Sequence, residues 1–467
     1  MKNFSKQTDV SAPQTVTDFI KLQTASEAIQ IGFTDQRVSP HAGLATFVGF
    51  LHWHRLNRLL QAWLPQRRRR SDAMAAHDLA LGFIVAVLAG AKKLAQVAWL
   101  RRDPLLPELL HIQRIGSQST LTRFFQGFST PGGNLAMLRQ LWHWAMDRLC
   151  SRPGGYTLDL DSTRLLHEDS HQEGVRTAPT PQGFRRCLHP LLAMIAEAKL
   201  VVGFWLRPGN AHCESNVIGF TLDLLSNLPR QVRLRLVRAD SGFCYGAWLD
   251  LLEEQHLDYI VVARLYQPVQ RLLKRETIWR PTEVPGTEVA EVMHQERGWR
   301  TARRLILLRH RLEEKERPCG KRLLDCPAYG FQALVTSLPF STCPIQVWRD
   351  YNGRAGCENI IKELDAHFGL PQLCLKKFWS TEAALGLAVF SYNLCVLFQR
   401  HLGWLERVSA GTLRFRLFST GGIISRSGGR TTVRLAVPQQ QRPWWRCVLE
   451  KLSSPFPNCN SVPFCSS

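Results

Sequence analysis

Three acidic residues, Asp161, Asp240 and Glu358, lie in local contexts that suit carboxylates able to hold a divalent metal ion. Glu358 ends a Y-x-x-R-x-x-x-E segment that starts at Tyr351 and contains Arg354. At about 100° per residue, the three named side chains of this segment fall at about 0°, 300° and 340° around a helix, so they project from one face. Carboxylates of this kind suit in-line phosphodiester hydrolysis, which needs a metal-activated water and a metal-stabilised leaving oxygen.

This chemistry predicts the cofactor and the roles of the neighbouring side chains. Two Mg²⁺ ions about 4 Å apart would supply both functions, with Mn²⁺ as a substitute, because hard cations prefer Asp and Glu oxygens to Cys or His. Arg354 and Tyr351, on the helical face of Glu358, would hold phosphates near the cut.

The two aspartates stand at the ends of predicted strands, where reactive side chains gather in α/β sheets. YTLDLDST alternates apolar and polar residues and predicts a strand that ends at Asp161, and RLVRAD predicts another that ends at Asp240. Taken singly, each aspartate also fits an ordinary helix cap or turn residue. Alternation alone allows Asp159 in place of Asp161, since both point to the same side of the strand.

The net charge of the chain indicates its partner. With 59 Lys and Arg against 38 Asp and Glu, the formal charge is +21 and the isoelectric point is about 9.8. Such an imbalance is typical of proteins that bind polyanions, and it predicts double-stranded DNA as the partner. A basic enzyme with no nucleic-acid partner remains the alternative. Because 45% of the residues are hydrophobic and 14 are Trp, the chain has enough apolar surface for a sizeable core and is no disordered basic tail.

The cysteine pattern and the apolar runs predict the cellular location. The 13 cysteines include no C-x-x-C pair, which argues against zinc ribbons and disulfide frameworks and favours reduced thiols. The first residues lack the apolar stretch of a signal peptide. The longest apolar run, Leu79 to Gly90, has 12 residues and is too short to span a bilayer. We therefore expect a cytoplasmic, nucleoid-associated protein without a membrane partner.

Changes in composition along the chain predict six segments. Strands alternating with helices after Gly154-Gly155 indicate an α/β domain, and alternating strands with turn residues interrupt it later. The predicted segments are a mobile polar arm (1–30), an all-helical DNA-binding module (31–150), an α/β catalytic domain in two parts (151–266 and 342–405), an inserted antiparallel β unit (267–341) and a C-terminal appendage with one short helix (406–467).

The helical module carries two candidate DNA contacts. Its helices have apolar residues at intervals of three and four, and a block of four arginines, Arg67, Arg68, Arg69 and Arg70, separates two of them. This block is predicted to bind phosphate, although such runs are often just solvated loops.

A short segment further along the module has the outline of a recognition helix. The segment from Gly116 predicts a turn, a helix cap and a short helix, and Gln118, Thr122 or Arg123 would contact bases. Any capped surface helix would give the same pattern.

The predicted β unit is strongly basic. Between Arg297 and Arg322 it has ten Lys and Arg against three acidic residues. A basic sheet with Trp299 in it is a plausible surface for a DNA end, since aromatic stacking adds to the attraction of charges such as Arg300, Arg303 and Arg304. Trp299 as an ordinary core residue is an equally valid interpretation.

Several motifs in order resemble the DDE transposases of bacterial insertion sequences, in the branch with a β-strand insertion before the last acid. They are DLDST, RPGN, RADSGF, YNGRAGCENIIKEL and STEAAL followed by YNL. The resemblance covers about half of the chain, from Gly155 to Arg400. It implies an RNase H-like fold for the catalytic domain, with Asp161, Asp240 and Glu358 as the catalytic and metal-binding acids. Thr163, two residues after Asp161, matches the D-x-T pattern of the family and favours Asp161 over Asp159.

The resemblance also implies an activity: binding of terminal inverted repeats, hydrolysis at the element ends and joining of the 3′-OH to target DNA. One position departs from the family pattern. Members of the wider group carry a lysine seven residues after the glutamate, and here that position is Asp365. The phosphate-binding role of that lysine must then pass to Lys362 or to Lys376 and Lys377.

Two other functions fit the same acids. An RNase H-like nuclease or resolvase would cut without joining, but it does not account for a helical module and a basic β unit. A DNA-binding protein that had lost catalysis would show damage at the acids, and all three are present. Pairing of two DNA ends implies a dimer or higher assembly on DNA, although the sequence shows no heptad seam.

Overall fold

The computed structural model describes residues 20–23, 28–65, 73–168, 171–180, 183–275, 279–312, 321–323, 326–404 and 406–453. Three parts of the sequence-based predictions lie outside these residues: most of the polar arm, the block from Arg67 to Arg70, and the end of the C-terminal appendage. Within the predicted arm, β1 (Ile20–Gln23) and β2 (Ala28–Ile31) form an antiparallel hairpin, where the sequence predicted only mobile chain.

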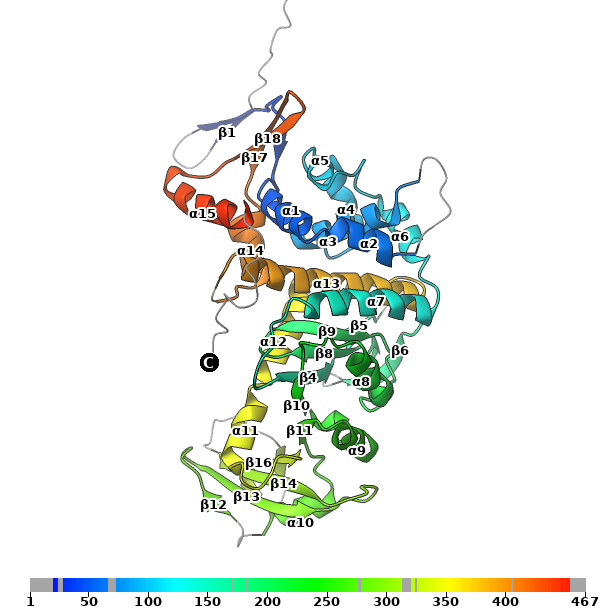
Figure 1. Cartoon of the computed structure of the whole chain (residues 1–467), viewed down its shortest axis with the longest axis vertical. Coiled ribbons are helices and arrows are strands. Elements are labelled where there is room, and N and C mark those ends of the chain that lie inside the picture. Colours follow the sequence, from blue (N-terminus) through cyan, green and yellow to red (C-terminus); the bar gives the residue numbers. More distant parts are fainter. Residues whose placement is uncertain are drawn as a thin grey trace, which may run out of the picture.

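A mixed sheet of ten strands forms the centre of the molecule, so the fold is α/β (Figure 1). Strand β10 is parallel to both of its neighbours, β4 and β11, whereas β8 and β9 continue the sheet beyond β4 in antiparallel order. The order across these five strands is β9-β8-β4-β10-β11. Their bounds are β4 (Tyr156–Ser162), β8 (Leu191–Ile195), β9 (Leu200–Trp205), β10 (Leu234–Ala239) and β11 (Asp258–Val262).

The strands of the predicted inserted antiparallel β unit, 267–341, are antiparallel to one another and extend this same sheet. Strand β16 pairs with β11, β14 with β16, and β13 with β14, all antiparallel. The physical reason is a shared apolar cluster, in which Ile306 and Leu334 pack with Leu236 and Ile260 of the core strands. The elements are α10 (Gln267–Leu273), β12 (Arg280–Pro281), β13 (Thr287–His294), β14 (Arg303–Arg311), β15 (Lys321–Leu323) and β16 (Cys326–Thr336).

Shorter elements surround the core strands. Between β4 and β8, where the sequence analysis named no strand, a small antiparallel sheet has the order β5-β7-β6. These elements are β5 (Leu165–Leu166), β6 (Arg176–Thr180), β7 (Gly183–Leu188), α8 (Val217–Ser226), η2 (Ser241–Phe243), α9 (Gly246–Glu254), α11 (Pro344–Asn352) and α12 (Ala355–His367).

Helix α13 (Phe378–His401) lies between the sheet and the helices above it (Figure 1). It is long and apolar enough to cross a membrane, but its apolar window is completely buried inside the protein, as expected of a core helix. The helix begins at Phe378, and Ser380, Thr381 and Glu382 of the STEAAL motif are buried in its first turns. Glu382 accepts hydrogen bonds from the Leu206 amide after β9 and from Asn134 on α7 (Pro131–Met146), joining the three layers.

The remaining helices before the sheet pack on the other side of α13. Helix α3 contacts α13 directly from this side, whereas α7 contacts both α13 and β9 of the sheet. The bounds of the other elements are β3 (Val38–Ser39), α1 (Leu44–Trp53), α2 (Leu56–Trp63), α3 (Ala76–Ala89), α4 (Leu94–Trp99), η1 (Leu100–Arg102), α5 (Leu106–Leu110) and α6 (Gln118–Phe125).

The C-terminal region packs on these helices, whereas the sequence predicted an appendage at 406–467. β17 pairs with both β3 and β18 in a three-stranded sheet, and the Trp53 indole of α1 donates a hydrogen bond to the Leu452 carbonyl at 2.6 Å. The pattern of these short elements was weak because most of their residues are exposed. The elements are α14 (Ala410–Leu413), the π-helical turn η4 (Arg414–Phe418), β17 (Gly422–Ser427), β18 (Arg430–Leu435), η5 (Gln439–Gln441) and α15 (Arg442–Ser453).

Candidate active site

Asp161 and Asp240 lie at matching ends of neighbouring parallel strands. In the register of β4 and β10, Leu160 pairs with Ala239, and the two aspartates are the next residues on each strand. The side chains are close enough that the charge of Asp240 contributes to raising the pKa of Asp161, to which burial contributes most. Two like charges at one edge of the sheet favour binding of a cation between them.

Asp161 is a buried carboxylate with partners on both of its oxygens. Its Oδ1 accepts a hydrogen bond from the Ser162 amide at 2.7 Å, and its Oδ2 lies 3.0 Å from the Arg354 guanidinium. The Cys357 thiol also donates to Oδ2, at 3.7 Å. Arg354 donates a second hydrogen bond to the Leu160 carbonyl at 3.1 Å, so it holds the end of β4 as well as the carboxylate.

Asp240 begins the turn that follows β10. Its Oδ1 accepts a hydrogen bond from the Gly242 amide at 2.9 Å and caps the short helix η2. Arg264, at the end of β11, donates to the Ser241 and Gly242 carbonyls at 3.0 and 3.1 Å. The cap uses one carboxylate oxygen, and the turn that presents Asp240 is held by the neighbouring strand.

Asp159 has a different role from Asp161, although alternation puts both on one side of β4. The Arg238 guanidinium donates to both of its oxygens, at 2.6 and 2.8 Å, and both side chains are buried. Arg238 also donates to the Asp350 carbonyl, where α11 ends. A Cβ atom added at Gly353 would lie 2.6 Å from an Arg238 nitrogen, so only glycine allows this close approach.

The Y-x-x-R-x-x-x-E segment, predicted as one helical face from Tyr351 to Glu358, is divided between two helices in the structure, which corrects its geometry. Tyr351 belongs to α11, Arg354 is the N-cap residue of α12, and Glu358 is exposed in the first turn of α12. The break occurs at Gly353, where the chain turns over Arg238.

Tyr351 lies close to all three acids. Burial raises the pKa of Tyr351 to about 12, and the charges of Asp240, Asp161 and Glu358 also raise it while Arg354 lowers it. The phenol is therefore neutral at physiological pH and can donate a hydrogen bond. Burial acts against the charge on Arg354, but the carboxylate of Asp161 more than compensates, so the pKa of Arg354 lies above its ordinary value.

The three acids fit a divalent cation by their chemistry, since all provide hard oxygen ligands. Within the described ranges, however, no group of three or more His, Cys, Asp or Glu side chains is close enough to hold a metal ion. Arg354 instead supplies the positive charge at Asp161. Asp161 and Asp240 thus lie at neighbouring strand ends, and the three-carboxylate metal site remains a prediction from the sequence.

A network behind Asp161 was missed by the sequence analysis. His189 contacts the Ser162 hydroxyl at 3.0 Å through Nε2 and the Ala211 carbonyl at 2.8 Å through Nδ1. Since the carbonyl can only accept, Nδ1 carries the proton and Ser162 donates to Nε2. The buried Arg207 donates to the carbonyls of His189, His212, Cys213 and Ser215 at 2.8 to 3.1 Å. Arg207 is the first residue of the RPGN motif, so the sequence did single it out. Its hydrogen bonds to backbone carbonyls, however, involve other segments of the chain and could not be read from the motif.

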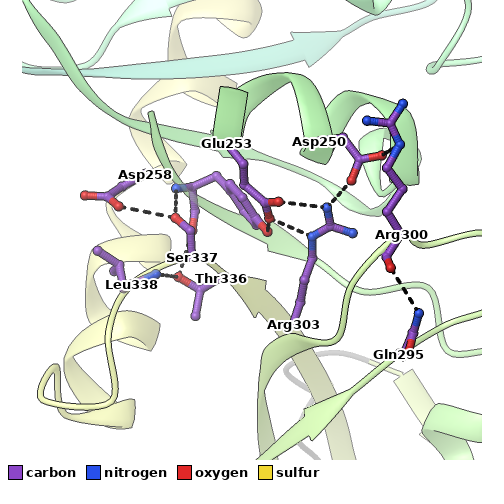
Figure 2. A network of polar contacts seen from close by, with 10 residues as sticks. Asp250, Glu253, Asp258, Gln295, Arg300, Arg303, Thr336, Ser337 and Leu338 are labelled. Atoms are coloured by element: carbon purple, nitrogen blue, oxygen red, sulfur yellow. Dashed lines mark hydrogen bonds and ion pairs between the residues drawn. The ribbon is translucent and has the colours of Figure 1, made fainter. Parts of the chain in front are cut away.

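Two of the predicted DNA contacts, Arg303 and Arg304, are buried, which corrects that prediction. Figure 2 shows Arg303 between the carboxylates of Asp250 and Glu253 on α9, with one nitrogen 2.7 Å from Glu253. Arg304 contacts Glu291 at 2.7 Å and also donates to backbone carbonyls after β16. These arginines stabilise the start of β14, because α9 and the chain after β16 cover the end of the strand on which they lie.

The other predicted contacts have mixed surroundings. Arg300 is exposed but pairs with Asp250 (Figure 2). It also pairs with Glu254. Trp299 lies in the turn before β14, half-buried against Gly246 and 5.2 Å from the Arg303 guanidinium, rather than inside a sheet. On α6, Ser117 caps the helix, and Gln118 and Arg123 are exposed whereas Thr122 is partly buried.

The helix after Glu358 also carries two residues that the sequence analysis weighed as phosphate ligands or their replacement. Lys362 is exposed. Asp365 is partly buried, burial raises its pKa to about 6, and its Oδ1 has no hydrogen-bond partner in the described part of the chain.

Comparisons with known proteins give one family. The family model described as "Transposase DDE domain group 1" matches residues 22–455. Among solved structures, the chain is similar to the cryo-EM structure of the piggyBac transposase synaptic complex with hairpin DNA, with 13% sequence identity and a TM-score of 0.42, over 92% of this chain and 89% of that chain. A TM-score of this size supports no inference from that structure. No curated protein matches the chain.

Asp159→Asn would leave the buried Arg238 guanidinium without its anion. We expect the free energy of unfolding to fall by about 3–5 kcal/mol, because the charge left behind is desolvated and unpaired. Urea unfolding followed by tryptophan fluorescence measures the change. Arg233→Gln, at an exposed position just before the same strand, is the control and should stay within about 0.5 kcal/mol of the unchanged protein. Equal stability of the two variants would show that the ion pair contributes nothing.

Arg303→Gln should destabilise the protein without weakening DNA binding. The substitution leaves Asp250 and Glu253 without their buried partner, so we expect a loss of about 3 kcal/mol in unfolding free energy. Arg300→Gln, at the exposed neighbour, is the matched comparison and should have little effect on stability. Thermal unfolding and duplex binding at a temperature where both variants are folded test this. If folded Arg303→Gln bound the duplex more weakly, Arg303 would have to be assigned a DNA contact after all.

Proposed function

The chain belongs to the DDE transposase family, and from this premise we propose that it binds the terminal inverted repeats of an insertion sequence, cuts the phosphodiester bonds at the element ends and joins the freed 3′-OH to target DNA. The observation that supports this function is the side-by-side placement of Asp161 and Asp240 at the ends of parallel strands, with Tyr351 close to both and to Glu358. We assign the five core strands to an RNase H-like catalytic domain, which is consistent with their mixed order.

We assign Asp161, Asp240 and Glu358 as the residues that would hold divalent cations, with Mg²⁺ as the proposed ion. When bound, such cations lower the pKa of an attacking water or 3′-OH and stabilise the leaving oxygen. The glutamate stands in the first turn of α12, directly after the break at Gly353, so a small movement of this helix start would change its distance from the aspartates.

The other side chains of the site position these groups. Arg354 neutralises Asp161 and ties it to the Leu160 carbonyl, so it keeps two like-charged aspartates together at this edge. The neutral phenol of Tyr351 is available to donate to a phosphate oxygen. His189 and Arg207 hold the backbone behind Asp161 through Ser162 and the loop after β9.

We propose double-stranded DNA as the partner, engaged by a dimer or larger assembly at the nucleoid. The formal charge of +21 supports a polyanionic partner. Lys362 and Arg300, which are exposed, remain candidate phosphate contacts, as do Gln118 and Arg123 on α6 for the repeat sequence.

Asp161→Asn, Asp240→Asn and Glu358→Gln should each reduce cleavage of a terminal-repeat duplex to below a few per cent of the normal rate. Each change removes a metal-binding charge with almost no change in shape, so binding of the duplex should persist. Gel assays of cleavage in Mg²⁺ and in Mn²⁺, with binding measured in parallel, test this. A variant that still cuts well identifies a residue that is not a ligand.

A strand-joining assay separates the main proposal from its alternative. Pre-cut repeat ends with a free 3′-OH are supplied together with a target plasmid, and joined products are measured. Cleavage that depends on the three acids without any joined product would favour a nuclease or resolvase over a transposase.

Arg354→Lys should slow cleavage at least tenfold. One terminal nitrogen of the buried guanidinium makes both contacts, to Asp161 and to the Leu160 carbonyl, and a compact, strongly hydrated ammonium on a flexible stem is less well held there. Arg349→Lys is the matched control, because Arg349 is an exposed arginine on α11 with a surface ion pair. Single-turnover cleavage at saturating protein measures the difference from this control. Equal rates would mean that Arg354 contributes only its charge.

A further inference from the structure

We propose that the hairpin of β17 and β18 is a second DNA-binding element, which holds the phosphate backbone of a duplex away from the catalytic acids. This proposal rests on the DNA-processing function proposed above and adds a site that the sequence analysis did not contain. The two strands stand on the far side of α13 from the sheet that carries Asp161 and Asp240 (Figure 1).

The charge pattern of this region is one-sided. Between Arg407 and Leu449 the sequence has eight arginines and no Asp or Glu. Two of the eight are used inside the protein, since Arg407 pairs with Glu363 and Arg414 donates to the carbonyls of Val87, Leu88 and His367. The other six are exposed: Arg416, Arg426, Arg430, Arg434, Arg442 and Arg446.

The register of the hairpin separates its two faces. One face packs inward, with Ile424 buried against Ala42 and Leu105. Arg426 and Thr431 pair on this face. Thr431 donates a hydrogen bond to Glu108 of α5, and the charge of Arg426 helps to lower the pKa of that carboxylate, which also pairs with Arg37. These contacts fasten the hairpin to the body of the protein.

The opposite face points outward and is made of small hydroxyl side chains and arginine. Ser425 pairs with Thr432, Ser427 with Arg430, and Ile423 with Arg434, and all six side chains are exposed. Neither Arg430 nor Arg434 has a carboxylate within ion-pair distance among the described residues. Arginines and hydroxyls are the side chains that most often contact DNA phosphates.

The shape of the element suits a duplex. Gly428 and Gly429 have φ angles of 56° and 76°, so a tight turn joins the strands and leaves a narrow two-stranded ribbon. The major groove of B-DNA admits such a ribbon, and its arginines would then reach the flanking phosphates. A membrane surface is a poorer match, because Ile423 is the one apolar side chain among those six outward residues.

The test compares duplex binding by Arg430→Gln/Arg434→Gln with binding by a matched control. The control, Arg233→Gln/Arg235→Gln, removes the same charge from exposed positions next to and on β10. Fluorescence anisotropy with a labelled duplex is recorded in EDTA, so that no cleavage occurs, over a range of salt concentrations. Arg430→Lys/Arg434→Lys keeps the charge and tests whether charge is the cause.

We expect the hairpin variant to bind about tenfold more weakly than the control near 0.1 M salt. The slope of log K against log salt should become shallower by roughly 2, since about 0.9 counterions are released for each phosphate contact. The lysine variant should recover most of the affinity. Equal affinity and slope in hairpin variant and control would overturn the proposal, as would unchanged duplex binding with lost binding to phosphatidylserine vesicles.

The experiment also distinguishes this proposal from the proposed function. A protein that binds duplex through the hairpin but never cuts or joins DNA would refute the transposase activity and leave the hairpin site standing. A protein that cuts and joins repeat ends, and whose hairpin variant binds like the control, would refute the hairpin site alone.

Discussion

The buried ion pair between Asp159 and Arg238 constrains the positions of Asp161 and Asp240 at the ends of their strands. It joins the two central parallel strands two residue pairs before Asp161 and Asp240, and the Arg238 guanidinium also donates a hydrogen bond to the Asp350 carbonyl near the end of α11. A buried arginine of this kind must be fully paired, because an unpaired charge in the interior is strongly destabilising. Strand spacing, the break at Gly353 and the start of α12 therefore depend on one side chain.

Above this pair lies a second, more exposed set of charges. Arg354 faces Asp161 as Arg238 faces Asp159, but Asp161 also borders Asp240 and lies next to the neutral Tyr351. The lower pair is closed, with both carboxylate oxygens occupied by one guanidinium. In contrast, no single guanidinium among the described residues occupies all the carboxylate oxygens of Asp161 and Asp240. Carboxylate oxygens of this kind could bind an external cation, which the proposed reaction requires.

Helix α13 separates the ten-stranded sheet from the strands β17 and β18, which present exposed arginines. Glu382 on this helix accepts hydrogen bonds from Asn134 on α7 and from the Leu206 amide after β9. Burial raises the pKa of Glu382 to about 7, and these two hydrogen bonds partly counteract that increase. The sheet and the helical layer are thus one packed body. A DNA contact on the hairpin of β17 and β18 would then be held at a constant distance from the acids.

The sequence by itself determined the α/β class, the positions of the core strands and helices and the ends at which Asp161 and Asp240 stand, because these depend on local periodicity and turn residues. It also pointed to the family, through motifs that are short and continuous. Only the tertiary structure showed which charged side chains are paired inside the protein and therefore cannot contact DNA. Arg303, Arg304, Arg207 and Asp159 look like any other charged residues in the sequence, and their partners come from other strands and helices, so no local pattern could show that they are buried. For the same reason, the merging of the predicted β unit into the central sheet and the break before Arg354 were decided by contacts between segments far apart along the chain.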